Sequence, residues 1–303
     1  MATDGILLTG CTGQVGGELL RLLAPLGTVH APTRAELDLA DPASIRSYVR
    51  SVRPRWIINP GAYTAVDKAE SEPAVAFAIN AEAPRVFSEE ARALGVPILH
   101  FSTDYVFPGQ GTSPYTEVDP TGPLGVYGAS KLAGEQALAA SGAAHLIFRT
   151  SWVYGTTGKN FLQTVLRVAG ERDQMNIVDD QHGAPTTSHD LAAMVLHVLT
   201  QCEAAAGTQP LVSVIAPLSG IYHAASLGES TWFGFASEAL RLRRLGEPSA
   251  RFAELVPIPS SAYPTPARRP HNSRLDTSKL HRTFGFQLPP WQQSLARVLS
   301  ELA

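Results

Sequence analysis

Cysteine is nearly absent from this chain, with only Cys11 and Cys202 among 303 residues. Two cysteines so far apart in the sequence do not make a disulfide framework, and a reducing cytosol is the expected setting. No apolar run reaches the roughly 20 residues that a membrane-spanning helix needs. The first five residues carry no basic patch, so no signal peptide is expected. These absences together predict a cytoplasmic protein.

Positive charge is not in excess either, since 24 lysines and arginines face 27 acidic residues and the net charge is -3. Neither a nucleic acid nor an anionic membrane surface is therefore an expected partner. The nine histidines stand singly, with no His-x-His or His-Glu-x-x-His pattern, and no metal site is predicted. Lysine is scarce, which makes Lys131 slightly less ordinary as a surface residue.

What the chain does have is an alternation of short apolar runs with helical patterns. The expected strands lie at residues 6–9, 28–32, 56–59, 98–101 and 145–149. Helices are expected between them, including residues 41–52 and one long helix over residues 73–94. This alternation predicts an α/β fold with a Rossmann-type, doubly wound parallel sheet.

The length favours two domains. Residues 1–155 are expected to form a Rossmann domain. Residues 156–303 are expected to form mainly a smaller α/β domain, with some segments returning to the first domain. In this second part, helices are expected at residues 160–171, 190–199 and 295–302, and residues 204–217 are expected to be a plain connection.

A glycine-rich turn follows the first expected strand. Gly10, Gly13 and Gly16 are spaced three apart in the run GCTGQVG at residues 10–16, just before a helical pattern. In a dinucleotide site the first glycine permits a tight turn, the second lets the backbone approach the diphosphate, and the third lets helix and strand pack closely. A plain strand–helix turn is the alternative, but the position directly after the first strand favours the dinucleotide site.

The end of the second strand bears on the choice of coenzyme. Thr33 and Arg34 stand where an NAD-binding protein has an acidic residue for the ribose 2′-hydroxyl. A guanidinium at this place suits a 2′-phosphate, which favours NADPH over NADH. Glu36 and Asp38 lie close enough in the sequence to take the acidic role instead, so NADH stays open.

Hydroxyl groups and a lysine follow at two further points. Ser102 and Thr103 end the fourth strand, and the carboxyl ends of parallel strands face the ligand crevice. Tyr127 and Lys131 lie one turn apart on one face of an expected helix. An ammonium near a phenol lowers the pKa of the phenol, which suits proton exchange with a substrate oxygen. The alternatives are a loop cap for the two hydroxyls and an ordinary amphipathic helix for the Tyr–Lys pair.

Two later stretches are rich in turn-forming residues. Residues 109–124 form a loop of proline, glycine and threonine that is a candidate lid over the site. Prolines between residues 257 and 270 stiffen a segment that carries Arg268, Arg269 and Arg274. Arginines on a rigid loop suit a diphosphate, and structural ion pairs are an equal alternative for them.

In this order, the glycine loop, the strand-end Ser-Thr and the helical Tyr-x-x-x-Lys resemble the extended short-chain dehydrogenase/reductases. Longer runs, from the first strand almost to the C-terminus, resemble one family within them, the dTDP-4-dehydrorhamnose reductases (RmlD family). These runs are TGQVG at 12–16, TAVDKAE at 64–70, STDYVF at 102–107, FRTSWVY at 148–154, AYPTP at 262–266, RP at 269–270 and NSRL at 272–275. The resemblance implies NAD(P)H-dependent reduction of the C4 keto group of dTDP-4-dehydro-β-L-rhamnose to dTDP-L-rhamnose, the last step of dTDP-rhamnose biosynthesis.

The same resemblance implies that residues 1–155 form an NADP(H)-binding domain with the catalytic residues and that residues 156–303 mainly bind the sugar nucleotide. It also implies the roles of individual residues. Tyr127 is expected to protonate the carbonyl oxygen and Thr103 to hydrogen-bond it, while Lys131 holds the nicotinamide ribose and lowers the pKa of Tyr127. Besides Tyr127 and Lys131, the expected cofactor contacts are Gly10, Gly13, Gln14, Val15, Gly16, Thr33, Arg34, Asp38, Leu39, Ala62, Tyr63 and Thr64. The expected substrate contacts are Thr103, Asp104, Val106, Tyr127, Trp152, Arg268 and Arg269.

The resemblance also has departures and alternatives. Some family members dimerise around magnesium held by glutamates; Glu18 matches one such position, but His189 follows Ser188 in place of another. Bound Mg²⁺ is therefore not favoured, and a monomer or homodimer is expected. A reductase of another dTDP-4-keto-6-deoxysugar, such as a dTDP-dihydrostreptose synthase, is one alternative. A non-catalytic subunit resembling the β subunit of methionine adenosyltransferase is another, although such a subunit has no need of Tyr127.

Overall fold

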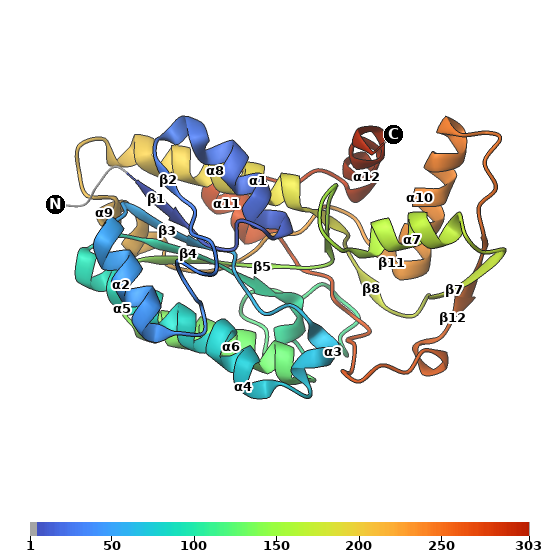
Figure 1. Ribbon diagram of the computed structural model, residues 1–303, viewed down its shortest axis with the longest axis horizontal. Coiled ribbons are helices and arrows are strands. Elements are labelled where there is room, and N and C mark those ends of the chain that lie inside the picture. Colours follow the sequence, from blue (N-terminus) through green and yellow to red (C-terminus); the bar gives the residue numbers. More distant parts are fainter. Residues whose placement is uncertain (1–4, 303) are drawn as a thin grey trace.

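The computed structural model describes residues 5–302, and a six-stranded parallel sheet runs through the part at the left of Figure 1. The strand order across the sheet is β10-β5-β4-β3-β1-β2. The strands are β1 (Ile6–Leu8), β2 (Val29–His30), β3 (Trp56–Asn59), β4 (Ile98–Thr103), β5 (His145–Thr150) and β10 (Gly220–His223). All neighbouring strands in it are parallel, so the predicted doubly wound, Rossmann-type fold is confirmed.

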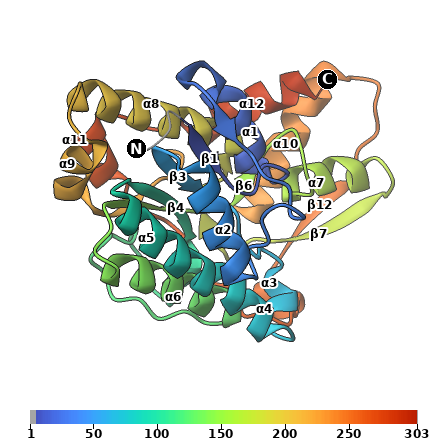
Figure 2. The same cartoon turned by 60° about the vertical axis from the view of Figure 1, so that its left-hand side comes forward.

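Helices cover both faces of this sheet (Figures 1 and 2). One face carries α1 (Gln14–Leu23), α8 (Ser188–Ala206), α9 (Leu211–Ile215) and α11 (Ser278–Phe284). The other face carries α2 (Pro42–Val52), α5 (Ala83–Leu94) and α6 (Val126–Ala140), with the short α3 (Val66–Ala69) and α4 (Pro73–Phe77) beside α6. Since α8, β10 and α11 come late in the chain, its second half also builds the sheet and its covering helices.

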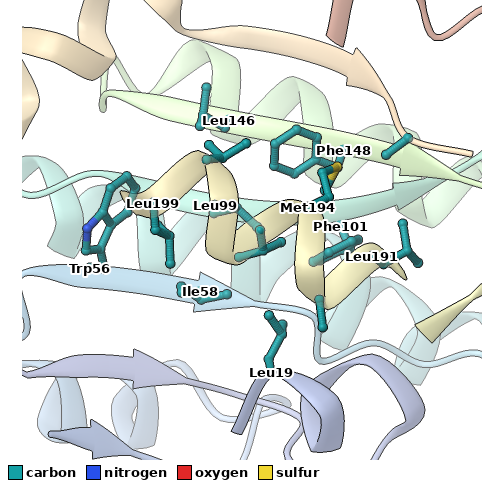
Figure 3. Close-up of a cluster of buried hydrophobic side chains, with 14 of the residues drawn as sticks. Leu19, Trp56, Ile58, Leu99, Phe101, Leu146, Phe148, Leu191, Met194 and Leu199 are labelled. Atoms are coloured by element: carbon teal, nitrogen blue, oxygen red, sulfur yellow. The ribbon is translucent and has the colours of Figure 1, made fainter. Parts of the chain in front are cut away.

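The core under α1 and α8 explains why the strand sequences are apolar at nearly every position. In Figure 3, Met194 of α8 lies beside Leu99 and Phe148 of the sheet, and Leu19 of α1 lies near Ile58; all five side chains are fully buried. Strands with helices on both faces have no solvent-facing side, so they do not alternate apolar and polar residues. Fully burying one such side chain stabilises the fold by about 1.5–3 kcal/mol.

The long helix expected over residues 73–94 is interrupted. The structure has α4, then a wider π-helical turn over Ala78–Glu82, and then α5. Pro84 has no N–H to donate to the carbonyl of Asn80 four residues earlier, which favours a wider turn there. Gly134 of α6 lies against that same carbonyl, because a Cβ on Gly134 would come within 2.1 Å of it. The widened turn therefore lies directly against the helix that carries Tyr127.

A second group of elements lies at the right of Figure 1. It contains the helices α7 (Phe161–Ala169), α10 (Trp232–Gly246) and α12 (Trp291–Glu301) and the parallel pair β7 (Gln174–Val178) and β12 (Glu254–Ile258). Two short pairs join it to the rest, namely β6 (Val153–Tyr154) with β9 (Thr186–Thr187) and β8 (His182–Gly183) with β11 (Ser230–Thr231). Aromatic side chains fill its core, among them Tyr154, Phe235 and Trp291.

Some elements of the second half differ from the sequence prediction. The plain connection expected over residues 204–217 is wrong, because α8 continues to Ala206 and α9 follows with Ile215 buried in the core. The strands β7, β10 and β12 are not predicted either; β10 is the edge strand beside β5. No helix within residues 5–302 is long and apolar enough to cross a membrane.

Candidate active site

The glycine-rich turn joins β1 to α1 as predicted. Gly10 has a φ of +60°, and a Cβ there would come within 2.8 Å of Cα of Gly61 in the loop after β3. A Cβ on Gly16 would lie 2.1 Å from the carbonyl oxygen of Gly10, so this turn needs glycine at both positions. Gly13 is the N-cap of α1 and no side chain caps the helix, so the first N–H groups, from Gln14 on, are available to an anion. These features fit the diphosphate of a dinucleotide.

The residues after β2 are arranged by short hydrogen bonds. The carboxylate of Glu36 accepts from the backbone N–H of Thr33 at 2.7 Å and from its hydroxyl at 2.8 Å, which lowers the pKa of Glu36. The Arg34 side chain is 80% exposed and lies 3.9 Å from Asp38. Leu39 lies over Gly61, beside the glycine turn. Glu36 is thus engaged by the backbone, while the Arg34 guanidinium extends into solvent, an arrangement that suits a 2′-phosphate.

The loop after β3 is held by a residue that the sequence analysis does not single out. Asn80, fully buried in the π-helical turn, accepts from the N–H of Tyr63 at 2.8 Å and donates to its carbonyl at 3.0 Å. Its amide also donates to the hydroxyl of Ser130 on α6 at 3.0 Å. Asn80 therefore fixes the loop of Ala62, Tyr63 and Thr64 against the helix that carries Tyr127 and Lys131. A lone polar residue in an apolar helix pattern is the only sequence signal for it.

Thr103 and Tyr127 come together at the carboxyl end of β4. The Thr103 hydroxyl donates to Asp104 at 2.9 Å and also interacts with the Tyr127 hydroxyl. Tyr127 is the second residue of α6, and its neighbour Gly128 is needed because a Cβ there would lie 2.2 Å from the carbonyl of Tyr105. The ring of Tyr105 packs edge-on against Tyr127, with centroids 5.6 Å apart. The phenol is thus held in a defined orientation beside Thr103.

The predicted lowering of the Tyr127 pKa by Lys131 is wrong for this structure. Burial raises the pKa of Tyr127 to about 12, opposed by the Thr103 hydroxyl and assisted by the charge of Asp104. Nζ of Lys131 donates to the carbonyl of Phe101 at 2.6 Å, and burial lowers its own pKa to about 8. Desolvation of the phenolate therefore dominates the Tyr127 pKa, and Lys131 is not among the groups that shift it.

Three buried oxygens at this end of the sheet have no hydrogen-bond partner within residues 5–302: the hydroxyls of Ser102 and Thr150, and Oδ2 of Asp104. Burial raises the pKa of Asp104 to about 6, although the hydroxyls of Ser273 and Thr103 oppose the rise. Unpaired buried polar atoms are uncommon in proteins, and a polar ligand is one way to satisfy them. The crevice is therefore equipped for a substrate rich in hydroxyl groups.

The remaining predicted substrate contacts are spread around the crevice. Trp152 has a φ of +48°, unusual for a bulky residue, and stacks on Trp232 with ring centroids 3.7 Å apart. This stack joins the end of β5 to the second group of elements. The side chain of Val106, in contrast, is fully buried in a cluster with Phe107 and Tyr115 and contacts no open space.

A cavity of about 420 Å³ opens beside the predicted lid. Its walls come from residues 108–110, 180–181 and 260–271. Arg268 lines it and has no ion pair within the described chain, whereas Arg269 is paired with Asp67 at 2.7 Å. Arg274, further along, is paired with Glu229 at 2.7 Å. Ion pairs thus engage Arg269 and Arg274, whereas Arg268 has none within residues 5–302, and Nη1 of Arg269 is buried there without a hydrogen-bond partner. Arg268 and Arg269 both stay predictions as substrate contacts.

The residues considered for magnesium, Glu18 of α1 and His189 of α8, lie next to each other. Glu18 accepts from Arg21 at 2.9 Å and lies 3.5 Å from Nδ1 of His189. Within residues 5–302, no group of three or more histidine, cysteine, aspartate or glutamate side chains is arranged to hold a metal ion. The Glu18 carboxylate is engaged by an arginine instead.

A glycine turn and a Thr–Tyr–Lys set at one edge of a Rossmann sheet define the class: a short-chain dehydrogenase/reductase that uses a nicotinamide coenzyme. Comparison with known proteins agrees. The family model described as the RmlD substrate binding domain matches residues 4–303. The chain is 46% identical to the dTDP-4-dehydrorhamnose reductase of Escherichia coli K12, covering 98% of this chain and 97% of that one. The Burkholderia thailandensis reductase is also 46% identical, with 98% of each chain covered.

Solved structures agree as well. A dTDP-4-dehydrorhamnose reductase from Clostridium acetobutylicum superimposes with a TM-score of 0.88 at 32% identity, covering 98% of this chain and 99% of that one. The Bacillus anthracis reductase, solved in complex with NADP, gives a TM-score of 0.86 at 31% identity, covering 99% of this chain and 100% of that one. The chain belongs to the dTDP-4-dehydrorhamnose reductase family.

Proposed function

We propose that this chain reduces the C4 keto group of dTDP-4-dehydro-β-L-rhamnose to give dTDP-L-rhamnose, with NADPH as the coenzyme. The observation that carries the proposal is the set of Thr103, Tyr127 and Lys131 at the carboxyl end of the sheet, in a chain 46% identical to a reductase of this name along nearly its whole length. A subunit that only binds a partner has no use for a buried proton donor.

When bound, NADPH supplies the hydride for the carbonyl carbon. Tyr127 gives its proton to the carbonyl oxygen. The Thr103 hydroxyl, turning its single hydrogen from Asp104, donates a hydrogen bond to that oxygen as negative charge develops. A pKa of about 12 keeps Tyr127 protonated throughout the neutral range, so the phenol has a proton to donate in each reaction. Transfer to an alkoxide is favourable because an alkoxide is more basic than a phenolate. Lys131 holds the nicotinamide ribose with the N–H donor that has no partner within residues 5–302.

Several residues support NADPH as the coenzyme. The uncapped N-terminus of α1 suits the diphosphate, and Arg34 suits the 2′-phosphate. The Bacillus anthracis relative was solved with NADP. NADH remains the competing coenzyme, because Asp38 lies next to Arg34.

We further propose that the two domains bind different ligands. Residues 1–155 hold the coenzyme and the catalytic residues, and residues 156–303 mainly bind the sugar nucleotide, apart from segments such as β10 that belong to the sheet. Asp104 and Trp152 contact the deoxysugar, and Arg268 and Arg269, which both line the cavity, contact the diphosphate. For Val106, the proposal is limited to shaping the crevice from the buried side.

The proposed setting is the cytoplasm, which suits two free thiols. The proposed assembly is a monomer or a homodimer without bound nucleic acid. Light scattering at micromolar concentration separates the two assembly states.

The test is NADPH consumption with dTDP-4-dehydro-L-rhamnose generated in place, followed by NMR of the product. Turnover to dTDP-L-rhamnose supports reaction and substrate together. Formation of the talose epimer would contradict the predicted stereochemistry while keeping the catalytic residues. No consumption despite bound coenzyme would favour another keto-sugar or the regulatory-subunit alternative.

A further inference from the structure

A row of buried polar side chains connects Lys131 with the two loops that face the cofactor site. Nζ of Lys131 lies 3.2 Å from Nε2 of His100, and Nδ1 of His100 lies 3.2 Å from the side-chain amide of Asn59. The hydroxyl of Thr9 donates to that amide at 2.6 Å and accepts from the backbone N–H of Gly61 at 3.2 Å. None of the four side chains, from Thr9 to Lys131, belongs to a residue more than 2% exposed.

Such a row is unexpected inside this core. His100 stands in the middle of β4, between the apolar residues Leu99 and Phe101, and is fully buried. A buried polar group destabilises a fold unless it is hydrogen-bonded, so an apolar residue is the ordinary choice at such a position. Burial, and secondarily the Lys131 ammonium, hold the pKa of His100 well below its usual value. The ring is therefore neutral, with one nitrogen able to accept a hydrogen bond.

The donors of Lys131 can be counted. An ammonium has three N–H donors and no acceptor. One donates to the carbonyl of Phe101 at 2.6 Å, and a second meets Nε2 of His100 at 3.2 Å. With Nε2 accepting, Nδ1 carries the ring hydrogen, and the Asn59 amide receives it when its oxygen end is turned toward the ring. In that orientation the NH2 end of Asn59 faces Thr9, so the Thr9–Asn59 hydrogen bond reverses and the Thr9 hydroxyl accepts it. One donor of Lys131 is then left for the cofactor side.

We propose that His100, oriented by Asn59 and Thr9, is a positioning residue that holds the Lys131 ammonium in place for catalysis. The inference rests on the function proposed above, in which Lys131 takes part. Thr9 directly precedes the glycine turn, and Gly61 belongs to the loop after β3 that lies against it. The same row therefore ties the ammonium to both loops that face the coenzyme, so that coenzyme and lysine are placed by one hydrogen-bonded unit.

The charged and titratable groups near Lys131 come from three elements. Tyr127 and Glu135 lie one turn before and one turn after it on α6, and Asp104 follows β4. Glu135 is paired with Arg149 of β5 at 2.6 Å and supports the ammonium form of Lys131. Since His100 is neutral, its removal leaves these charges unchanged and takes away one acceptor. The ammonium becomes less favourable, and the pKa of Lys131 falls.

The experiment compares His100→Leu, His100→Gln and His145→Leu in the full chain. Leucine removes the acceptor, and glutamine can restore one near the position of Nε2. His145 is the matched control, a buried histidine at the amino end of β5 whose Nδ1 bonds the Ala143 carbonyl at 2.8 Å. The readouts are kcat, KM for the sugar nucleotide, NADPH binding by fluorescence and the pH profile of kcat.

We expect His100→Leu to lower kcat about 10- to 100-fold and to move the alkaline limb of the pH profile about one unit lower, with KM nearly unchanged. His100→Gln should recover most of kcat and the position of the limb, and His145→Leu should keep both. Wild-type kcat and pH profile in His100→Leu would overturn the inference. Equal losses in His100→Leu and His145→Leu would overturn it too.

A fourth variant separates this inference from the proposed function. If Lys131→Met keeps full turnover, Lys131 has no part in the reaction, and the proposed mechanism fails first. A large loss in Lys131→Met with none in His100→Leu removes only the positioning role. Should His100→Leu not fold, Thr9→Val tests the far end of the row: a smaller shift of the same sign supports the inference, and an unchanged profile overturns it.

Discussion

Tyr127 is the residue on which the proposed chemistry depends most. Replacing it with phenylalanine removes the proton donor and keeps the ring that packs against Tyr105. We expect Tyr127→Phe to lower kcat by about 10²–10⁴-fold, the usual contribution of general acid catalysis, with NADPH binding nearly unchanged. Steady-state kinetics and coenzyme fluorescence measure the two effects. Retained turnover would remove Tyr127 from the mechanism.

Arg34 decides between the two coenzymes. Its side chain is 80% exposed and only loosely associated with Asp38, so alanine should leave the fold intact. We expect Arg34→Ala to weaken NADPH binding about tenfold or more and to leave NADH binding nearly the same, because only NADPH carries the 2′-phosphate. Titration with each coenzyme gives the comparison. Equal losses for both would show that the 2′-phosphate is read elsewhere.

Asp104 is expected to lower the stability of the folded protein at neutral pH while it contributes to the active site. Its pKa is about 6 in the folded protein against 3.8 for a free side chain, so the burial penalty is absent below pH 4 and complete above pH 6. An asparagine stays neutral at every pH. We expect Asp104→Asn to be more stable than the parent at pH 8, by about 2–3 kcal/mol, with the difference vanishing near pH 4. Turnover should fall, since the free oxygen of Asp104 is lost.

Asp119 provides the control of opposite sign. Its carboxylate accepts from the N–H and the hydroxyl of Thr116, which lowers its pKa. Its ionised form therefore supports the fold, and this support is lost as the pH falls. Asp119→Asn should be the less stable protein at pH 8. Urea unfolding at several pH values tests both variants; a pH-independent difference for Asp104→Asn would contradict the argument.

For single residues, the sequence predicts a role in the site when the position of the residue within its own helix or strand is sufficient to indicate it. The spacing of Tyr127 and Lys131 on one helix face, and the position of Thr103 at a strand end, are visible without coordinates. The roles of Asn80 and His100 are not, because their partners lie 17 to 50 residues away in the chain. The direction of the Tyr127 pKa is also invisible, since it depends on how completely the fold buries the hydroxyl.

Among the elements, the contact between α6 and the π-helical turn is the most sensitive to change. Alanine normally stabilises a helix relative to glycine by about 1 kcal/mol. At Gly134, however, a Cβ would lie 2.1 Å from the backbone carbonyl of Asn80, which cannot move without disturbing Tyr63. We expect Gly134→Ala to destabilise the protein by about 1–3 kcal/mol, the usual effect of overpacking, and to lower kcat.

Gly246 gives the matched control. It is the last residue of α10, and a Cβ there would meet no atom of residues 5–302 within 4 Å. Gly246→Ala should be neutral or slightly stabilising. Thermal unfolding of both variants measures the effect, and equal stability of Gly134→Ala and the parent protein would mean that α6 can shift away from Asn80 without loss.

A helix or strand can be predicted from the sequence when the residues that cause it lie within the element or next to it. Strands such as β3 and β4 are apolar runs with helices on both sides, and the Asp41–Pro42 pair marks the start of α2, where the Asp41 side chain caps the N–H of Ala43. β10, in contrast, is a strand because β5 offers it a free edge, a partner more than 70 residues away. The π-helical turn likewise depends on a proline and on a glycine of another helix.

At the scale of the whole molecule, a buried carboxylate joins the two groups of elements. Asp190 of α8 is 4% exposed; its Oδ1 accepts from Arg297 of α12 at 2.6 Å, and its Oδ2 accepts from Thr187 and Ser294. The helix α8 lies against α1 and the sheet, whereas α12 packs on α10. Arg297 is therefore the cation that neutralises a charge at the junction.

Removing that cation should loosen the junction without touching the active site. Arg297→Ala leaves Asp190 buried and uncompensated, which we expect to destabilise the protein by about 2–3 kcal/mol, less than for a fully buried pair because the Arg297 side chain is 37% exposed. Arg167→Ala breaks an exposed pair with Glu171 and should change stability by less than about 0.5 kcal/mol.

The shape of the unfolding transition shows whether the junction couples the two groups of elements. If it does, the urea unfolding curve of Arg297→Ala becomes broader, with a lower slope of the free energy of unfolding against urea, because the group of α7, α10 and α12 unfolds first. A transition as sharp as the parent's, only shifted, would mean that the aromatic core couples them without this ion pair.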